Sequence, residues 1–346
     1  MRRALFQVHL WVGVLTGAYI FVVSLTGAAL VFRIDLQRAL YPPLFTPKAQ
    51  GALADPVMVM ESVSRAYPGD ALSGVEAPTG ARPTYLAYVT RGPEFLTILI
   101  DPVSAEVLGG LPVRTLLRTV QELHFNLLLG RNGRIVNGLG ASCALLMCLT
   151  GAVLWWQSRR NWRRVVWEAH RTIGAWSVVF IAMWAVTGLS LAFPREFRSA
   201  VGWLSPITAS PTPQSSARAK ALALQGSSGW RAQIEAARRA KPGLPVARVV
   251  LPFNDRAAFV VMFATASPTP AGETLAPVYL DQFTGQVIDE ARAPHTMGDR
   301  LMSWMVPLHV GDFSSRALKT LWFLMGLTPA ILFVSGFVIW LKQVRA

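Results

Sequence analysis

The chain has 346 residues, of which 52% are hydrophobic and only 15% are charged, and its mean hydropathy is +0.39. This composition excludes a water-soluble domain of that length and predicts an integral membrane protein. The net charge is +14, and the basic residues are spread along the long segments between the apolar stretches. Most of them are expected to form a solvated basic surface. The charge also suggests attraction to anionic substrates or lipid head groups. Nucleic acid is not an expected partner.

Four apolar stretches are long enough to cross a bilayer, which takes about 20 helical residues. They predict transmembrane helices within residues 1–34, 135–157, 171–193 and 317–346, the last with a short tail. A loop of residues 158–170 joins the second helix to the third. The first stretch ends in Leu30, Val31 and Phe32 rather than in small residues, which favours a retained helix over a cleaved signal peptide.

The short connections carry the positive charge that normally stays in the cytoplasm. Arginines precede the first stretch and fill the short loop, and Lys342 and Arg345 follow the last stretch. Both termini are therefore expected in the cytoplasm of a bacterial cell whose inner membrane holds the chain. The long segments 35–134 and 194–316 then face the periplasm.

Both long segments show the same order of predicted elements. In each segment, a short helix and a Pro-Gly turn are followed by β-rich runs. An aspartate then precedes two adjacent apolar residues, Val107-Leu108 in the first segment and Val287-Ile288 in the second. The helices are predicted at 57–66 and 230–240, and the strands at 84–90 and 95–100 in the first segment and at 246–251, 258–263 and 276–280 in the second. This pattern predicts two α+β inserts, each followed by an interfacial helix.

Four of the five histidines stand at the ends of the apolar stretches in two repeated contexts. The first context is His9, Gly13 and Gly27, repeated at identical offsets as His170, Gly174 and Gly188. The second is His124, Arg131 and Thr150-Gly151, repeated as His309, Arg316 and Ser335-Gly336. The repeats predict an internal parallel duplication with a pseudo-twofold axis along the membrane normal. Histidines retained in this way are expected to be ligands.

The same stretches resemble the PepSY-associated transmembrane family, whose members include inner-membrane ferric-siderophore reductases. The resemblance rests on HLWVGVLTGAYIFVVSLTGAALVF, ELHFNLLLGRNGRIVNGLG, EAHRTIGAWSVVFIAMWAVTG, VPLHVGDFSS and, in the first insert, DPVSAEVLGG. It covers nearly the whole chain. It implies a four-span α-helical bundle with two PepSY-like inserts, and a haem protein that passes electrons to periplasmic iron complexes.

The histidines support haem from the residues alone. The pseudo-twofold axis can bring His9 next to His170 at the cytoplasmic face, and His124 next to His309 at the periplasmic face. Two b-type haems with bis-histidine ligation would need no cysteine attachment motif, and the chain has none. The cysteines, Cys143 and Cys148, are expected to be apolar core thiols.

The other repeated residues suggest roles around such haems. Gly13 with Gly27, and Gly174 with Gly188, would form smooth helix faces for a flat macrocycle, although close helix packing explains them equally well. Arg131 and Arg316 would pair with haem propionates or else anchor the helices at the interface. His295 has no repeated counterpart and is expected to be a surface or structural residue, with substrate contact as the alternative.

The sequence therefore predicts a reductase that takes electrons from a cytoplasmic or quinol donor and delivers them to a ferric siderophore or other ferric chelate. No dinucleotide or phosphate-loop motif provides an electron donor within the chain. Two alternatives remain: a membrane-anchored PepSY protein that binds peptides or proteases without redox activity, and a permease for a siderophore or haem. The predicted spans contain no carboxylate, which disfavours a proton-coupled permease.

Overall fold

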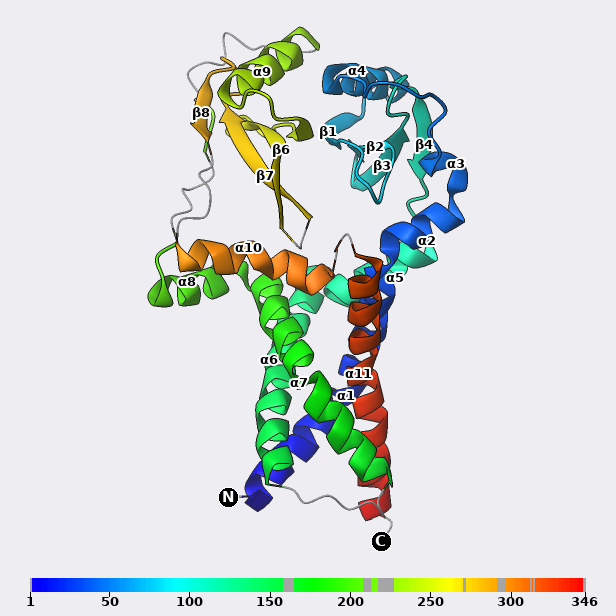
Figure 1. The fold of residues 1–346 in the computed structure, drawn as a ribbon, viewed down its shortest axis with the longest axis vertical. Coiled ribbons are helices and arrows are strands. Elements are labelled where there is room, and N and C mark those ends of the chain that lie inside the picture. The colour runs from blue at the N-terminus through cyan, green and yellow to red at the C-terminus, as the bar shows by residue number, and fades with distance from the viewer. Residues whose placement is uncertain are drawn as a thin grey trace. The chain divides into compact units, whose positions relative to one another are not determined.

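The computed structural model describes residues 2–157, 165–207, 213–216, 227–269, 272–290, 296–311, 313 and 315–344. The chain divides into a helical unit and a sheet unit (Figure 1). The helical unit comprises residues 1–33, 116–207 and 296–346, and the sheet unit comprises residues 34–115 and 208–295. Arginines 159, 160, 163 and 164 of the predicted loop, Arg345 and His295 lie outside the described residues.

Four helices of the described residues are long and apolar enough to cross a membrane: α1 (Arg2–Val31), α6 (Gly130–Trp156), α7 (Val165–Ala192) and α11 (Arg316–Val344). The chain is thus a multi-pass membrane protein. In the helical unit α1 packs against α6 and α11, and α7 packs against the same two helices. Three shorter helices complete the unit: α5 (Leu116–Asn126) on α1 and α6, α8 (Pro194–Leu204), and α10 (Met297–Val310) on α7 and α8.

Helix α7 begins at Val165, within the stretch predicted as a loop. Hydropathy alone ends a span at the first charged residues, whereas helical hydrogen bonding continues through them. The extension places Glu168 on a membrane-spanning helix, where its side chain is buried and pairs with Arg171 at 3.5 Å. A carboxylate therefore lies on the third helix, one turn below the predicted span.

The sheet unit holds one antiparallel sheet of eight strands in the order β4-β3-β2-β1-β5-β6-β7-β8. Its first half consists of α2 (Arg33–Leu40), α3 (Pro42–Phe45), α4 (Pro56–Ala66), β1 (Ala71–Glu76), β2 (Tyr85–Arg91), β3 (Glu94–Ile100) and β4 (Val107–Leu111). Its second half consists of α9 (Ser227–Ala240), β5 (Val246–Val250), β6 (Phe259–Thr269), β7 (Gly272–Leu280) and β8 (Val287–Glu290). Helices α4 and α9 contribute Met60, Val63 and Ile234 to a core with strand residues such as Ile98 and Phe263.

The two predicted inserts do not form separate sheets, because β1 pairs with β5. Gly74 lies opposite Val250 in this pairing, and a Cβ at Gly74 would stand 2.5 Å from the carbonyl oxygen of Val249. Any larger residue would push the two strands apart. The pairing removes an exposed edge from each half, and exposed edges invite aggregation.

Asp101 fixes the turn between β3 and β4. Its Oδ1 accepts hydrogen bonds from the backbone N–H groups of Val103 and Ser104, both at 2.9 Å. Its Oδ2 accepts from Lys48 N at 2.6 Å and Ala49 N at 3.3 Å, which ties the preceding segment to the turn. Burial by itself raises the pKa of Asp101, but these four donors stabilise the carboxylate more, and the pKa is lowered to about 2.

Asp281 occupies the equivalent turn between β7 and β8. Its Oδ1 accepts from Phe283 N and Thr284 N, both at 2.9 Å, and its Oδ2 accepts from the backbone N–H of Ser216. Burial again raises the pKa of Asp281, and the backbone donors lower it further than burial raises it. The two halves of the sheet thus close their last hairpin with the same interaction.

Replacing Asp101 should destabilise the sheet unit. Asp101→Ala leaves four backbone donors without their acceptor, and we expect a loss of about 2–4 kcal/mol of unfolding free energy at pH 7. The depressed pKa means that this stabilisation is present above the unfolded pKa of about 3.9 and is lost as the pH falls toward 2. Hydrogen exchange of β3 and β4 should therefore be faster in the variant at pH 7, with the difference shrinking as the pH falls from 4 to 2.

A matched control is Glu106→Ala, which removes the exposed ion pair with Lys48. Exposed pairs contribute little, so this variant should exchange at the wild-type rate. Equal exchange in Asp101→Ala and wild type would contradict the role given to Asp101.

Candidate functional site

The four repeated histidines form two pairs in the helical unit. His9 of α1 and His170 of α7 have ring centres 6.5 Å apart, with ring planes at 87°. His124 of α5 and His309 of α10 have ring centres 6.1 Å apart, with ring planes at 45°. Each pair therefore takes one histidine from each half of the chain. We call them the lower pair (His9 and His170) and the upper pair (His124 and His309).

Every one of these imidazoles has its Nδ1 next to a hydroxyl group on a spanning helix. The partners are Thr150 for His9 at 2.8 Å, Ser335 for His170 at 2.9 Å, Thr26 for His124 at 3.2 Å and Thr187 for His309 at 2.9 Å. Each hydroxyl residue directly precedes a glycine in the sequence. The repeated Thr-Gly and Ser-Gly dipeptides are therefore the supports of the histidines, a role that the sequence analysis did not assign to the hydroxyl residues.

The direction of these hydrogen bonds fixes the imidazole tautomer. Each hydroxyl donates its own proton to the carbonyl oxygen four residues earlier on its helix; for Thr150 this is Leu146 O at 2.8 Å, and for Ser335 it is Ile331 O at 2.9 Å. The hydroxyl oxygen can then only accept, so Nδ1 of the histidine donates. His124 adds a second argument, because its Nδ1 also lies 3.0 Å from the carbonyl oxygen of Val23, which cannot donate.

A neutral imidazole that donates from Nδ1 has its lone pair on Nε2. The described residues contribute no hydrogen bond to Nε2 of any of the four histidines. This is the arrangement of a metal-binding histidine, in which the nitrogen away from the metal is held by a second group that orients the ring.

The glycine of each dipeptide lets the imidazole edge lie against the helix backbone. A Cβ on Gly151 would stand 3.2 Å from Cε1 of His9, and a Cβ on Gly336 would stand 3.2 Å from Cε1 of His170. In the upper pair, a Cβ on Gly27 would stand 2.7 Å from Cε1 of His124, whereas the gap from Gly188 to His309 would be 3.6 Å. Gly27 and Gly188 therefore face imidazoles, where the sequence predicted a macrocycle.

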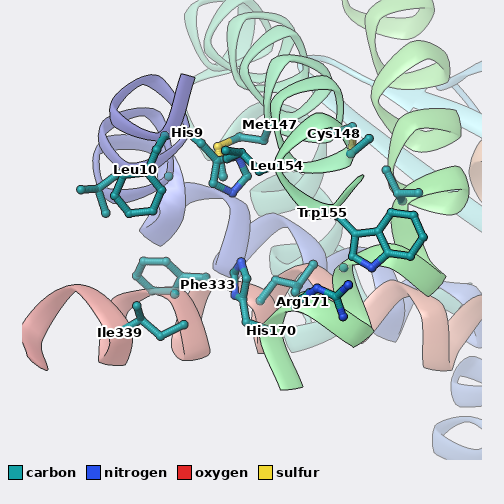
Figure 2. A pocket seen from close by; sticks show the side chains of 18 of the residues that line it. His9, Leu10, Met147, Cys148, Leu154, Trp155, His170, Arg171, Phe333 and Ile339 are labelled. Carbon is teal, nitrogen blue, oxygen red and sulfur yellow. The ribbon is translucent and has the colours of Figure 1, made fainter. Parts of the chain in front are cut away.

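Gly13 and Gly174 line a cavity of about 1160 Å³ that also contains the lower pair (Figure 2). The two imidazoles face one another across it. A Cβ on Gly13 would stand 3.0 Å from Cε of Met147, and a Cβ on Gly174 would stand 3.6 Å from Leu332, so both glycines widen the space beside the histidines.

The two predicted site arginines are not among the residues that line this cavity. Arg131 and Arg316 stand at the first turns of α6 and α11, and both are exposed. Cys148 of α6 lines the cavity as a buried free thiol, and Cys143 is a half-buried free thiol. The described residues contain no group of three or more His, Cys, Asp or Glu side chains that could hold a metal ion by themselves.

Gly27 and Gly188 should differ in how well they tolerate replacement by alanine, because their distances to the facing imidazoles differ. Gly27→Ala should displace the His124 ring, because 2.7 Å is too short for two carbon atoms, and should lower the melting temperature of the detergent-solubilised protein. Overpacking of this kind costs about 1–3 kcal/mol. Gly188→Ala, the matched control in the other half, creates an ordinary van der Waals contact and should melt within a degree or so of wild type. Equal melting of the two variants would contradict the geometry of the upper pair.

The comparison with protein families agrees with the resemblance noted in the sequence. The chain matches the family described as the PepSY-associated TM region over residues 6–343. A comparison with curated proteins finds no match. The family match covers the four membrane helices and the sheet strands together, and the chain belongs to the PepSY-associated transmembrane family.

Proposed function

We propose that each histidine pair binds the iron of one b-type haem and that the protein is a two-haem ferric reductase. The observation that supports this most directly is the fourfold repeated arrangement in which a neutral imidazole donates from Nδ1 to a helix hydroxyl. Bound haem would supply a one-electron carrier, and the chain would hold, orient and insulate it.

The spacing within each pair would allow both imidazoles to bind one metal ion. Imidazole nitrogens bind first-row metal ions at about 2.0 Å and lie about 1.1 Å from the centre of their own ring, so two axial imidazoles have ring centres about 6.2 Å apart. The observed values are 6.5 Å for the lower pair and 6.1 Å for the upper pair.

The number of ligands also favours haem over a bare metal ion. Structural zinc sites use four protein ligands, and catalytic zinc sites use three. Each pair provides two ligands, and the described residues add no third. Haem would bring the nitrogens of its own macrocycle and would need only the two imidazoles of one pair from the chain. The cavity of about 1160 Å³ at the lower pair, widened by Gly13 and Gly174, offers room for a macrocycle.

The two pairs lie near opposite faces of the membrane. His9 is near one end of α1, and Thr26, which supports His124, is near the other end. At a rise of 1.5 Å per residue, the 17 residues between them span about 25 Å along the helix. We infer that the lower pair is on the cytoplasmic side, because Arg2, Arg3 and Lys342 flank that end of the bundle. The sheet unit, formed by the two duplicated inserts, then faces the periplasm of a bacterial cell.

The proposed reaction moves one electron at a time across the inner membrane. Haem held by the lower pair would supply a carrier that a cytoplasmic or quinol donor could reduce, and haem held by the upper pair would supply the carrier from which a ferric siderophore or other ferric chelate would receive the electron. The ferric ion becomes ferrous, which binds hard oxygen ligands less tightly, so the metal leaves the chelate. The only described carboxylate on the third helix, Glu168, is paired with Arg171, which fits an electron path better than a proton relay.

Haem content tests the pairing directly. Purified protein should carry two b-type haems with a low-spin bis-imidazole spectrum that sharpens on dithionite reduction. His9→Ala and His170→Ala should each remove or perturb one haem, and His124→Ala and His309→Ala the other, because each haem needs both imidazoles of a pair. The measurement is haem per protein together with the visible spectrum.

Folded protein that stays colourless after expression with adequate haem would refute the haem proposal and favour a binding or regulatory protein. Loss of one common haem in both His9→Ala and His124→Ala would refute the pairing. His295→Ala serves as the control and should retain both haems.

Electron flow should be directional. In proteoliposomes, a ferric siderophore offered at the sheet-unit side should reoxidise both reduced haems, with ferrous iron trapped by a chelator. His9→Ala should keep the upper haem but slow its reduction from the opposite side at least tenfold, because the lower haem receives the electron first. Unchanged reduction of the upper haem in a variant that lacks the lower one would rule out the two-step path.

A further inference from the structure

The cavity at the lower pair has a cationic end. Its lining is mostly apolar and aromatic, and the charged side chains among the described residues that line it are all arginines: Arg2, Arg3 and Arg171. No carboxylate is among these lining residues. A cavity with apolar walls and guanidinium groups at one end is complementary to a flat apolar molecule that carries negative charge along one edge.

Arg171 is the arginine that the structure fixes in place. Its Nη1 lies 3.5 Å from Oε2 of Glu168, one turn earlier on α7, and its guanidinium carbon lies 5.6 Å from the centre of the Trp155 ring on α6. The Arg171 side chain is only 16% exposed and that of Glu168 is 9% exposed. Figure 2 shows Arg171 between His170 and the Trp155 ring.

This setting makes Arg171 a prepared anion-binding group. The contacts with Glu168 and Trp155 restrict the side chain, so little conformational entropy remains to be lost when an anion binds. The apolar surroundings strengthen a charge-assisted hydrogen bond relative to water. A guanidinium presents five N–H donors, so it can pair with one carboxylate and bind a second.

We propose that Arg171 binds a carboxylate on the edge of the haem held by the lower pair. This inference rests on the proposed function and adds to it the group that would hold the haem carboxylates, at the cationic end of the cavity. At the lower site, Arg171 takes the role of pairing with a haem propionate that the sequence predicted for Arg131 and Arg316. Arg171 is not part of the repeated pattern, since the matching residue in the first half is Leu10.

Arg131 and Arg316, the two arginines named from the sequence, are not placed to serve the lower haem, because each lies 19 residues from the helix hydroxyl that supports the lower pair. Arg131 and Arg316 are exposed, where a guanidinium competes with water and gains little from a single ion pair. Arg171 is nearly buried and stands next in the chain to a ligand of the iron. An anionic lipid head group offers similar oxygen chemistry, and the experiment separates it from a propionate.

The test changes the ligand rather than only the protein. Haem-free protein in a His309→Ala background, which lacks the upper site, is titrated in detergent with haem b and with haem b dimethyl ester, and the Soret band reports binding. The protein with Arg171 intact should bind the free acid about tenfold or more tightly than the ester. Arg171→Gln should weaken binding of the acid to near that of the ester and leave the ester affinity unchanged. Arg131→Gln is the matched control and should keep the full preference.

Each result decides the proposal. Equal affinity for acid and ester in the protein with Arg171 intact, or the same preference in Arg171→Gln, would overturn it. So would loss of tightly bound phospholipid from Arg171→Gln with the preference unchanged, which would assign Arg171 to a lipid head group. Failure of the parent protein to bind either haem with a bis-imidazole spectrum would instead refute the proposed function, because that outcome concerns the histidines and not Arg171.

Discussion

The hydrogen bond from an imidazole Nδ1 to a helix hydroxyl is the interaction on which the whole site depends. It occurs four times, on Thr150, Ser335, Thr26 and Thr187. Without this bond, the hydroxyl would donate to a carbonyl oxygen of its own helix but accept no hydrogen bond. The imidazole N–H would have no acceptor in the apolar bundle. The bond solves both problems and also sets the tautomer that exposes Nε2. The glycine that follows each hydroxyl residue lets the ring lie close enough for the bond to form.

This interaction also explains how the two halves of the chain cooperate. Each histidine is supported within its own half: α6 supports His9 of α1, and α11 supports His170 of α7. Each faces its partner from the other half. The distance between the two rings of a pair therefore depends on how the two halves pack together, through the contacts of α1 with α11 and of α6 with α7. The orientation of each ring depends only on the hydroxyl group within its own half.

The sequence predicted the family, the membrane class and the histidine partners, because hydropathy and repeated offsets are local signals. It also showed the Thr-Gly and Ser-Gly dipeptides as repeated, but offsets along one chain do not indicate that Thr150 faces His9. The joined sheet was missed for a similar reason, since pairing of β1 with β5 is a contact between distant segments with no pattern of its own. Glu168 was missed because hydropathy began the third span at residue 171, after it. Arg171 was missed because the matching position in the first half, Leu10, carries no charge, so the repeat does not mark it.

The upper pair shows what holding a histidine on a short helix requires. Helix α5 ends two residues after His124, and the next two residues, Leu127 and Leu128, have φ of 53° and 61°, a region that costs a non-glycine residue about 1–2 kcal/mol. In the other half α10 ends at Val310 and is followed by the C-cap residue Gly311, whose φ of 68° has no such cost.

The strained corner after His124 is stabilised by hydrogen bonds from outside α5. Asn137 of α6 donates to the carbonyl oxygen of His124 at 2.8 Å, and the His124 ring donates to Thr26 and Val23 of α1. Spanning helices therefore fix both the backbone and the ring of this histidine. The position of His124 therefore depends on the membrane bundle more than on the stability of the short helix that carries it, and such support from rigid neighbouring elements keeps the geometry of a side chain constant.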